Sequence, residues 1–322
     1  MIYLIYLVLA AIVVFLSIKA SVYVDQIDKN TEVSGAFIGG VLLSAVTSLP
    51  ELFTTISSTV WLDNPGLSLG NVLGSNLFNT TIIAVMILFG VNSFKSAEVS
   101  RSHAYSSLVT LLIYVVIYLN MVKILDFEIL TINIVSIVIL ILYILGVKLM
   151  SNDDSVESEE EQEAAITENF NLKQVIIKFV FASIGIVASS ILITYVTDII
   201  AVRLNLGASL AGALLLGIAT SLPELTSCIS LAKIGNFNVA IGNIVGSNLF
   251  NFFILFVADL LYISGSIYNF NDAQSWNLVI YGLLSNLLIL AILNSKKRVK
   301  STFFYILCSL GILASYFLFM IA

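Results

Sequence analysis

Two glutamates stand inside apolar stretches of the chain, each directly after a proline. Glu51 ends the sequence VTSLPE at positions 46–51, and Glu224 ends the sequence ATSLPE at positions 219–224. A carboxylate in an apolar helix is costly to keep, so it is functional by default. Hard cations such as Ca²⁺ and Na⁺ prefer oxygen ligands, and two carboxylates neutralise one divalent ion. The paired glutamates therefore predict an oxygen-lined cation site.

The residues before each glutamate supply further oxygens. Two of the three prolines in the chain are Pro50 and Pro223. Proline lacks an amide hydrogen and clashes with the carbonyl four residues earlier, so we expect each helix to break or kink at its Thr-Ser pair. Carbonyls freed in this way need new partners in lipid, and a cation is such a partner. The hydroxyls lie four and three positions before the glutamate, on its face of a helix, and belong to Thr47, Ser48, Thr220 and Ser221.

A second motif places amide and hydroxyl groups on one face of each of two further helices. It reads GNVLGSNLFN at positions 70–79 and GNIVGSNLFN at positions 242–251. Its polar side chains recur at four-residue steps, as Asn71, Ser75 and Asn79 and as Asn243, Ser247 and Asn251. Glycines at 70, 74, 242 and 246 are expected to allow close helix packing.

Composition places these motifs in a membrane. Of the 322 residues 59% are hydrophobic and 11% are charged, and the mean hydropathy is +1.05. Such a chain is too apolar for a soluble domain and must use the lipid bilayer as part of its solvent. We find no feature that suggests nucleic-acid binding. The first apolar run is expected to be a retained helix and not a signal peptide.

The two motifs recur at offsets of 173 and 172 positions, so the chain consists of two similar halves. Runs long enough to cross about 30 Å of hydrocarbon are predicted at 2–24, 35–61, 67–91, 104–122, 125–149, 174–202, 208–234, 239–264, 275–294 and 302–321. An acidic segment, 150–172, separates repeat 1–149 from repeat 173–322 and is expected to be a solvated linker. An odd number of helices per repeat inverts the second copy. The predicted fold is an all-α polytopic membrane protein with ten transmembrane helices in two inverted five-helix repeats.

The distribution of basic residues predicts the orientation in the cell membrane. In the ten-helix arrangement 12 of the 14 lysines and arginines fall on one side, and only Lys123 and Arg203 fall on the other. By the positive-inside rule the side rich in basic residues is cytoplasmic. Both termini are then external, and the linker is cytoplasmic.

Other reactive residue types are interpreted as structural. Cys228 and Cys308 lie in different apolar runs without metal-ligand spacing, so both are predicted to be packing residues. The only histidine, His103, is expected in a loop, which argues against a soft-metal site. Asp259 has no counterpart in the first half and is placed at the membrane interface, and Asp198 near a helix end.

The paired TSLPE and GSN motifs resemble those of the cation/calcium exchanger superfamily, and within it the prokaryotic type of the sodium/calcium exchanger branch. The resemblance covers the whole chain. It implies that Glu51 and Glu224, with the carbonyls of Thr47 and Thr220, bind Ca²⁺. It further implies that four serines help to form flanking Na⁺ sites: Ser48, Ser75, Ser221 and Ser247. Asn79 would line the centre of the site. Helices one and six of such proteins slide across the site to alternate access.

Three residues bear on the coupling ion. The family commonly has an aspartate where this chain has Asn251, which we include in the site. The proton-coupled branch usually has glutamate where this chain has Ser75 and Ser247, and this difference favours sodium. The leading hypothesis is a secondary antiporter that exchanges Ca²⁺ for Na⁺, with no cofactor and no obligate protein partner. The alternatives are a proton-coupled or other divalent-cation exchanger, a cation channel, and an intramembrane enzyme, for which we find no substrate-holding basic cluster.

Overall fold

The structure is a computed structural model that describes residues 1–29, 43–129, 131–151, 171–233, 235, 237–270, 272–296, 298–299 and 301–321. Within these ranges the protein is almost entirely helical. Seven of the described helices are long and apolar enough to cross a membrane. They are α1 (Ile2–Lys29), α5 (Pro65–Phe89), α7 (Ser102–Met121), α9 (Leu172–Leu204), α13 (Phe237–Leu261), α14 (Ala273–Ser295) and α15 (Thr302–Ile321).

Two further segments are broken at the glutamate motifs. The first consists of α3 (Leu43–Thr47), α4 (Leu49–Ile56) and a π-helix, η2 (Ser57–Trp61). The second consists of α10 (Ala208–Ala211), the π-helix η5 (Gly212–Gly217), α11 (Ile218–Thr220) and α12 (Leu222–Lys233). The two parts of the second segment are bent by 45°, and counting them as one span gives eight in the described chain. The breaks fall at Ser48 and Ser221, directly before each Leu-Pro pair, as the prolines predict.

The predicted span 125–149 begins later than expected. Glu128–Ile129 (β1) pairs with Ile132–Asn133 (β2) in a short antiparallel ladder, and α8 (Ile134–Ser151) follows. Lys123 and Asp126 form an ion pair of 2.8 Å before the ladder. These charges keep the first residues of the predicted span in a polar connection. Two short helices, α6 (Val91–Ser96) and the 3-10 helix η6 (Ile267–Asn269), also lie in connections. Residues 35–42 of the second predicted span, and most of the linker (152–170), lie outside the described residues.

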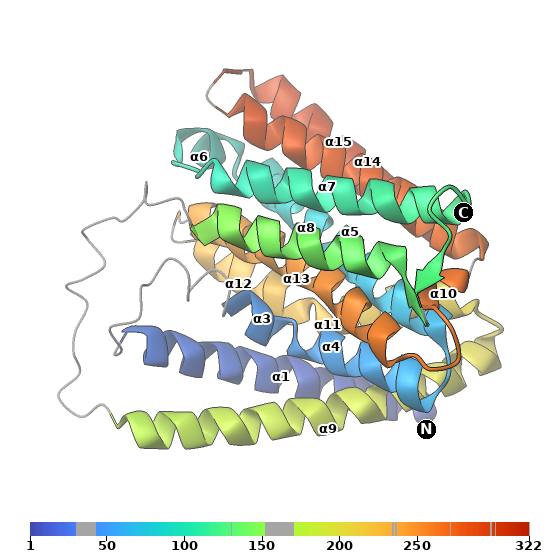
Figure 1. Cartoon of the computed structure of the whole chain (residues 1–322). Coiled ribbons are helices and arrows are strands. Elements are labelled where there is room, and N and C mark those ends of the chain that lie inside the picture. Colours follow the sequence, from blue (N-terminus) through green and yellow to red (C-terminus); the bar gives the residue numbers. More distant parts are fainter. Residues whose placement is uncertain are drawn as a thin grey trace.

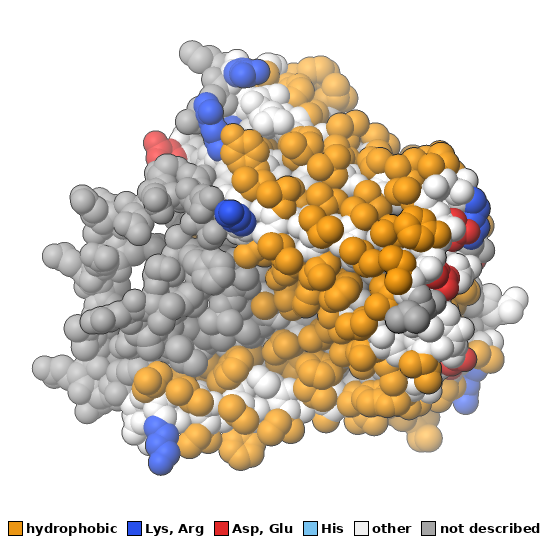
Figure 2. Space-filling model, in the orientation of Figure 1, with side chains coloured by type: hydrophobic (Ala, Val, Ile, Leu, Met, Phe, Trp, Pro, Cys, Tyr) orange, Lys and Arg blue, Asp and Glu red, His pale blue; other side chains and the backbone are white. Residues whose placement is uncertain are grey.

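The helices that carry the second motif lie inside the protein. Most residues of α5 and α13 are buried, whereas α1 and α9 are largely exposed. Figure 1 shows α1 and α9 side by side along one edge, running in opposite directions, with α14 and α15 at the opposite edge. Hydrophobic side chains cover most of the described surface that faces the viewer in Figure 2. An apolar exterior around a polar interior is the arrangement expected of helices that face lipid.

Glycines bring α5 into backbone contact with the second broken segment. A Cβ at Gly70 would overlap the backbone of Ser209, and one at Gly74 would overlap Ala213. The close packing predicted for these two glycines is confirmed. Gly242 packs instead against the side chain of His103.

Asp259 is completely buried near the end of α13, and the membrane-interface level expected for it stays a prediction. Its Oδ1 accepts hydrogen bonds from Ser266 Oγ (2.7 Å) and from the amide of Ile267 (3.0 Å). Its Oδ2 accepts from Ser136 Oγ (2.7 Å) and from the amide of Asn133 (3.0 Å). Four donors, two from Asn133 and Ser136 at the start of α8 and two from the connection after α13, compensate the carboxylate for its lost hydration.

His103 does not lie in a loop. It is buried in the first turn of α7, with its Nε2 3.0 Å from Asn238 Oδ1. The described residues include no group of three or more histidine, cysteine, aspartate or glutamate side chains that could hold a metal. Cys228 and Cys308 are both free thiols in the core, as expected of packing residues.

Candidate functional site

The breaks in the two segments place both glutamates in the middle of the protein. Glu51 lies in the first turn of α4 and Glu224 in the first turn of α12, and both are completely buried. All ten residues predicted for the site are described, and none is more than 1% exposed. The structure brings most of them into one polar layer between α5 and α13, through the contacts given below.

Hydroxyl groups join the two motifs crosswise. Ser221 Oγ donates to Glu51 Oε1 at 3.1 Å, so the carboxylate of the first repeat is bonded from the second. The two threonine hydroxyls also lie near serines of the opposite repeat: Thr47 Oγ1 is 3.4 Å from Ser247 Oγ, and Thr220 Oγ1 is 3.5 Å from Ser75 Oγ. The arrangement on a single helix face, expected from the spacing, does not describe these contacts, because each helix breaks between its threonine and its glutamate.

Within the second repeat, Ser247 Oγ donates to Glu224 Oε1 at 3.3 Å. Ser247 therefore connects Thr47, from the first repeat, to the carboxylate of Glu224 in the second repeat. Ser75, the counterpart of Ser247, bonds the opposite repeat instead and donates to the carbonyl of Gly217 at 3.2 Å.

Four asparagines bridge α5 and α13. Asn79 Nδ2 donates to Asn248 Oδ1 at 3.0 Å, and Asn251 Nδ2 donates to Asn76 Oδ1 at the same distance. Asn76 and Asn248 also donate to each other's backbone carbonyls, at 3.3 and 3.5 Å. Sequence reasoning missed these two residues, because they lie one position off the four-residue stripe. The signal that could have found them is their place in both copies of the GSN motif.

Several oxygens in this layer have no hydrogen-bond partner in the protein. They are Glu51 Oε2, Glu224 Oε2, Ser48 Oγ, Asn79 Oδ1 and Asn251 Oδ1. Buried polar atoms are almost always paired, so a group of unpaired oxygens calls for an explanation. Oxygens that include two carboxylates are suited to a hard cation, which needs no donor hydrogen from the protein.

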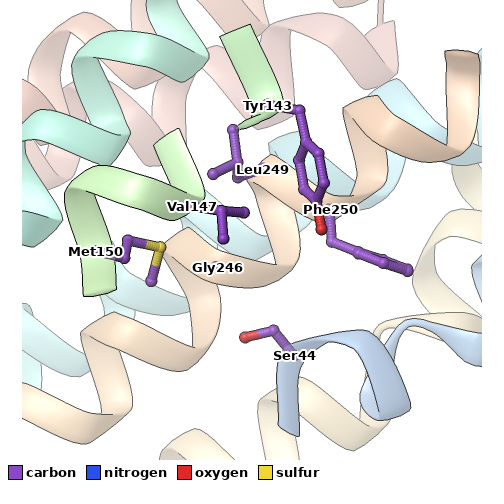
Figure 3. Close-up of a pocket in the computed structure, with 7 residues that line it drawn as sticks. All are labelled: Ser44, Tyr143, Val147, Met150, Gly246, Leu249 and Phe250. Atoms are coloured by element: carbon purple, nitrogen blue, oxygen red, sulfur yellow. The ribbon is translucent and has the colours of Figure 1, made fainter. Parts of the chain in front are cut away.

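A small, mostly apolar pocket lies at the edge of this layer (Figure 3). It is lined by Ser44, Tyr143, Val147, Met150, Gly246, Leu249 and Phe250. Thr47 Oγ1 donates to the carbonyl of Ser44 at 3.1 Å, and Gly246 directly precedes Ser247. The pocket between α3, α8 and α13 therefore lies one helical turn from Thr47 and directly beside Ser247, two residues of the polar layer.

The sequence profile of the family described as "Sodium/calcium exchanger protein" matches residues 2–151 and 174–322. The chain belongs to this family. This confirms the prediction from the repeated TSLPE and GSN motifs, which resemble those of sodium/calcium exchangers. The family consists of ion exchangers and not of catalytic enzymes, and it transports ions without a cofactor.

Two curated relatives of this exchanger-family chain are membrane proteins. "Uncharacterized membrane protein MJ0091" of Methanocaldococcus jannaschii is 26% identical over 225 residues, which cover 70% of each chain. "Inner membrane protein YrbG" of Escherichia coli is 25% identical over 238 residues, which cover 71% of this chain and 70% of the relative.

Solved exchangers share the fold of this family member. The H⁺/Ca²⁺ exchanger CAX aligns with a TM-score of 0.70 at 14% identity, over 99% of this chain and 89% of the other. The sodium-calcium exchanger NCX_Mj, soaked with Na⁺ and Sr²⁺, aligns with a TM-score of 0.61 at 22% identity, over 98% and 99%. At these identities the likeness establishes the fold alone.

Proposed function

We propose that the protein is a secondary antiporter that exchanges Ca²⁺ for Na⁺ across the cell membrane by alternating access. Ten transmembrane helices in two inverted five-helix repeats would hold the ions at Thr47, Ser48, Glu51, Ser75, Asn79, Thr220, Ser221, Glu224, Ser247 and Asn251. The observation that carries the proposal is the pair of completely buried glutamates, each with one oxygen that lacks a protein partner.

The reciprocal contacts support a two-fold relation between the repeats. Thr47 approaches Ser247 as Thr220 approaches Ser75, and Asn79 bonds Asn248 as Asn251 bonds Asn76. Each contact occurs twice with the roles of the repeats exchanged. The antiparallel course of α1 and α9, which begin the two repeats, agrees with an inversion (Figure 1).

The charge of the proposed site favours one Ca²⁺ or two Na⁺ as the substrates. Asn79 and Asn251 cannot ionise, so the fixed charge comes from Glu51 and Glu224 alone. Two carboxylates are balanced by one divalent or two monovalent cations, whereas three Na⁺ would leave a surplus positive charge in a medium of low dielectric constant.

The coupling ion is tested by calcium uptake into vesicles. We expect an outward Na⁺ gradient to drive uptake and a pH gradient alone to drive little. Uptake should fall as the pH is lowered, because protons neutralise the same two carboxylates that hold the cations. The measurement is uptake by proteoliposomes with the membrane potential clamped at several values, and its voltage dependence distinguishes two Na⁺ from three. Robust uptake with a pH gradient and no effect of Na⁺ would establish a proton-coupled exchanger instead.

The proposed orientation has external termini and a cytoplasmic linker. Two exposed serines in opposite connections test it: Ser264, after α13, and Ser96, at the end of α6. A membrane-impermeant maleimide added to intact cells should label Ser264→Cys and leave Ser96→Cys unlabelled. The unmodified protein, whose two cysteines are buried, is the control. The reverse labelling pattern would invert the orientation.

A further inference from the structure

The two copies of the second motif differ in what their first asparagine does. Asn71 ties α5 to the helix that carries Glu51. Its Nδ2 lies 2.8 Å from Thr54 Oγ1, 2.9 Å from Thr55 Oγ1 and 3.2 Å from the carbonyl of Glu51 itself. Its Oδ1 lies 3.5 Å from Thr220 Oγ1. Both ends of this amide are engaged, and the backbone of the glutamate is held directly.

Asn243 is the counterpart of Asn71 and makes none of these contacts. It is 3% exposed, and neither its Nδ2 nor its Oδ1 has a hydrogen-bond partner. A buried amide with both polar atoms unpaired has lost its hydration without gaining hydrogen bonds, which is unfavourable. A conformation in which the Asn243 amide is hydrogen-bonded would avoid this cost. The residues that correspond to Thr54 and Thr55 are Ser227 and Cys228, on α12. Ser227 offers a hydroxyl, whereas the thiol of Cys228 is a weaker partner and lies 3.5 Å from Met86 Sδ.

The two asparagines act at opposite ends of the protein. Asn71 lies in α5 near the connection between Trp61 and Pro65, which the orientation proposed above makes external. Asn243 lies in α13 near the connection after Lys233, which is then cytoplasmic. Two more hydrogen bonds hold the external end together: Tyr6 Oη donates to the carbonyl of Leu215 at 2.6 Å, and Asn64 Nδ2 donates to Asp198 Oδ1 at 3.1 Å.

These bonds join α1 and α9 to the broken segment η5 and to the start of α5. At the other end, the pocket of Figure 3 lies beside Ser44, whose Oγ is 3.5 Å from the carbonyl of Asn243. The pocket therefore lies within one helical turn of Asn243, through Gly246. The cytoplasmic end is also bonded, away from the glutamate-bearing helices, where the amide of Ser100 donates to Asn238 Oδ1 at 2.9 Å.

We propose that Asn71 and Asn243 are positioning residues that clamp the two glutamate-bearing helices in alternation. In the conformation described, Asn71 clamps α4 and closes the external end, while Asn243 is released. In the opposite conformation Asn243 hydrogen-bonds to α12, at the carbonyl of Glu224 and the side chains of Ser227 and Cys228. The hydrogen bonds of Asn71 to α4 are then broken. The proposal rests on the antiport function and gives its alternating access a named pair of contacts.

The first test strengthens the proposed contact between Asn243 and α12. Cys228→Thr supplies the hydroxyl that the first repeat has at Thr55, and Cys228→Val has the same shape without it. Cys228→Thr should lower the apparent KM for external Ca²⁺ and raise that for cytoplasmic Ca²⁺, each by about two- to tenfold, the factor expected for one hydrogen bond acting on a two-state equilibrium.

Asn243→Ala should shift both values in the opposite direction, and combining it with Cys228→Thr should remove the effect of the threonine. Cys228→Val should show no opposed shift. A merely structural role would change both KM values in the same direction or neither. Equal behaviour of the threonine and valine variants would overturn the proposal.

Cross-linking tests the alternation without transport, so it separates a failed clamp from a failed antiport function. The protein carries Thr55→Cys with Asn71→Cys and Asn243→Cys with the native Cys228, while Cys308→Ser removes the remaining thiol. After mild oxidation, mass spectrometry should find molecules with one disulfide or the other. Both disulfides in one molecule, or only the 55–71 disulfide, would overturn the proposal. If the unmodified protein exchanges no Ca²⁺ under any gradient, the antiport function fails and this result still decides the clamp.

Discussion

Replacing either Glu51 or Glu224 with glutamine is expected to abolish calcium transport while the protein stays folded. Glutamine has nearly the same shape and still accepts the hydrogen bond that Ser221 or Ser247 donates. It carries no charge, so a divalent ion would be only half neutralised in a buried site, where uncompensated charge is most costly. The measurement is radioactive Ca²⁺ uptake by proteoliposomes, with the melting temperature as the check on folding.

Asp259→Asn makes the same chemical change in a buried carboxylate outside the polar layer. It should lower the melting temperature, because an amide has one acceptor oxygen for the four donors that surround Asp259. The folded fraction should still take up Ca²⁺. Near-normal uptake by either glutamate variant would show that the ions bind elsewhere.

Gly70→Ala is expected to prevent folding or to destabilise the protein severely. The added methyl group would overlap the backbone of Ser209, and a backbone cannot rotate away as a side chain can. The helix α5 would have to separate from the second broken segment, which would pull apart the contact of Ser75 with Gly217. Gly185→Ala in α9 is the matched control, because its methyl group would meet only the flexible end of Leu16.

The control should melt at or above the temperature of the unmodified protein, since alanine favours a helix over glycine by about 1 kcal/mol. Thermal unfolding in detergent, followed by size-exclusion chromatography, compares the two variants. Equal melting temperatures for both would mean that α5 and the second broken segment do not pack as closely as the structure shows.

The main features of the site could be predicted because they depend on local chemistry. Proline breaks a helix wherever it occurs, so Pro50 and Pro223 indicated the discontinuities directly. A glutamate in an apolar run has few reasons to be there, which singled out Glu51 and Glu224. The polar stripe on α5 followed from helical periodicity alone.

The partners of these residues could not be predicted in the same way. Spacing describes neighbours within one helix, and a break at Ser48 or Ser221 ends that regularity. The bond from Ser221 to Glu51 joins residues 170 positions apart and depends on how two repeats pack. The burial of Asp259 could not be predicted for a similar reason, because its donor Asn133 is 126 positions away in a connection that was predicted to be part of a span.

The crosswise bond between the repeats also has a consequence for biosynthesis. When the first repeat enters the membrane, the chain that contains Ser221 and Asn248 has not yet been made. At that stage Glu51 lacks its donor, the hydroxyl of Ser221, and Asn79 lacks its acceptor, the amide oxygen of Asn248. The first repeat is therefore an intermediate with unpaired polar groups, and the polar layer can form only when the residues from Ser221 to α13 have been inserted. Inserting the second repeat completes the interior of the first.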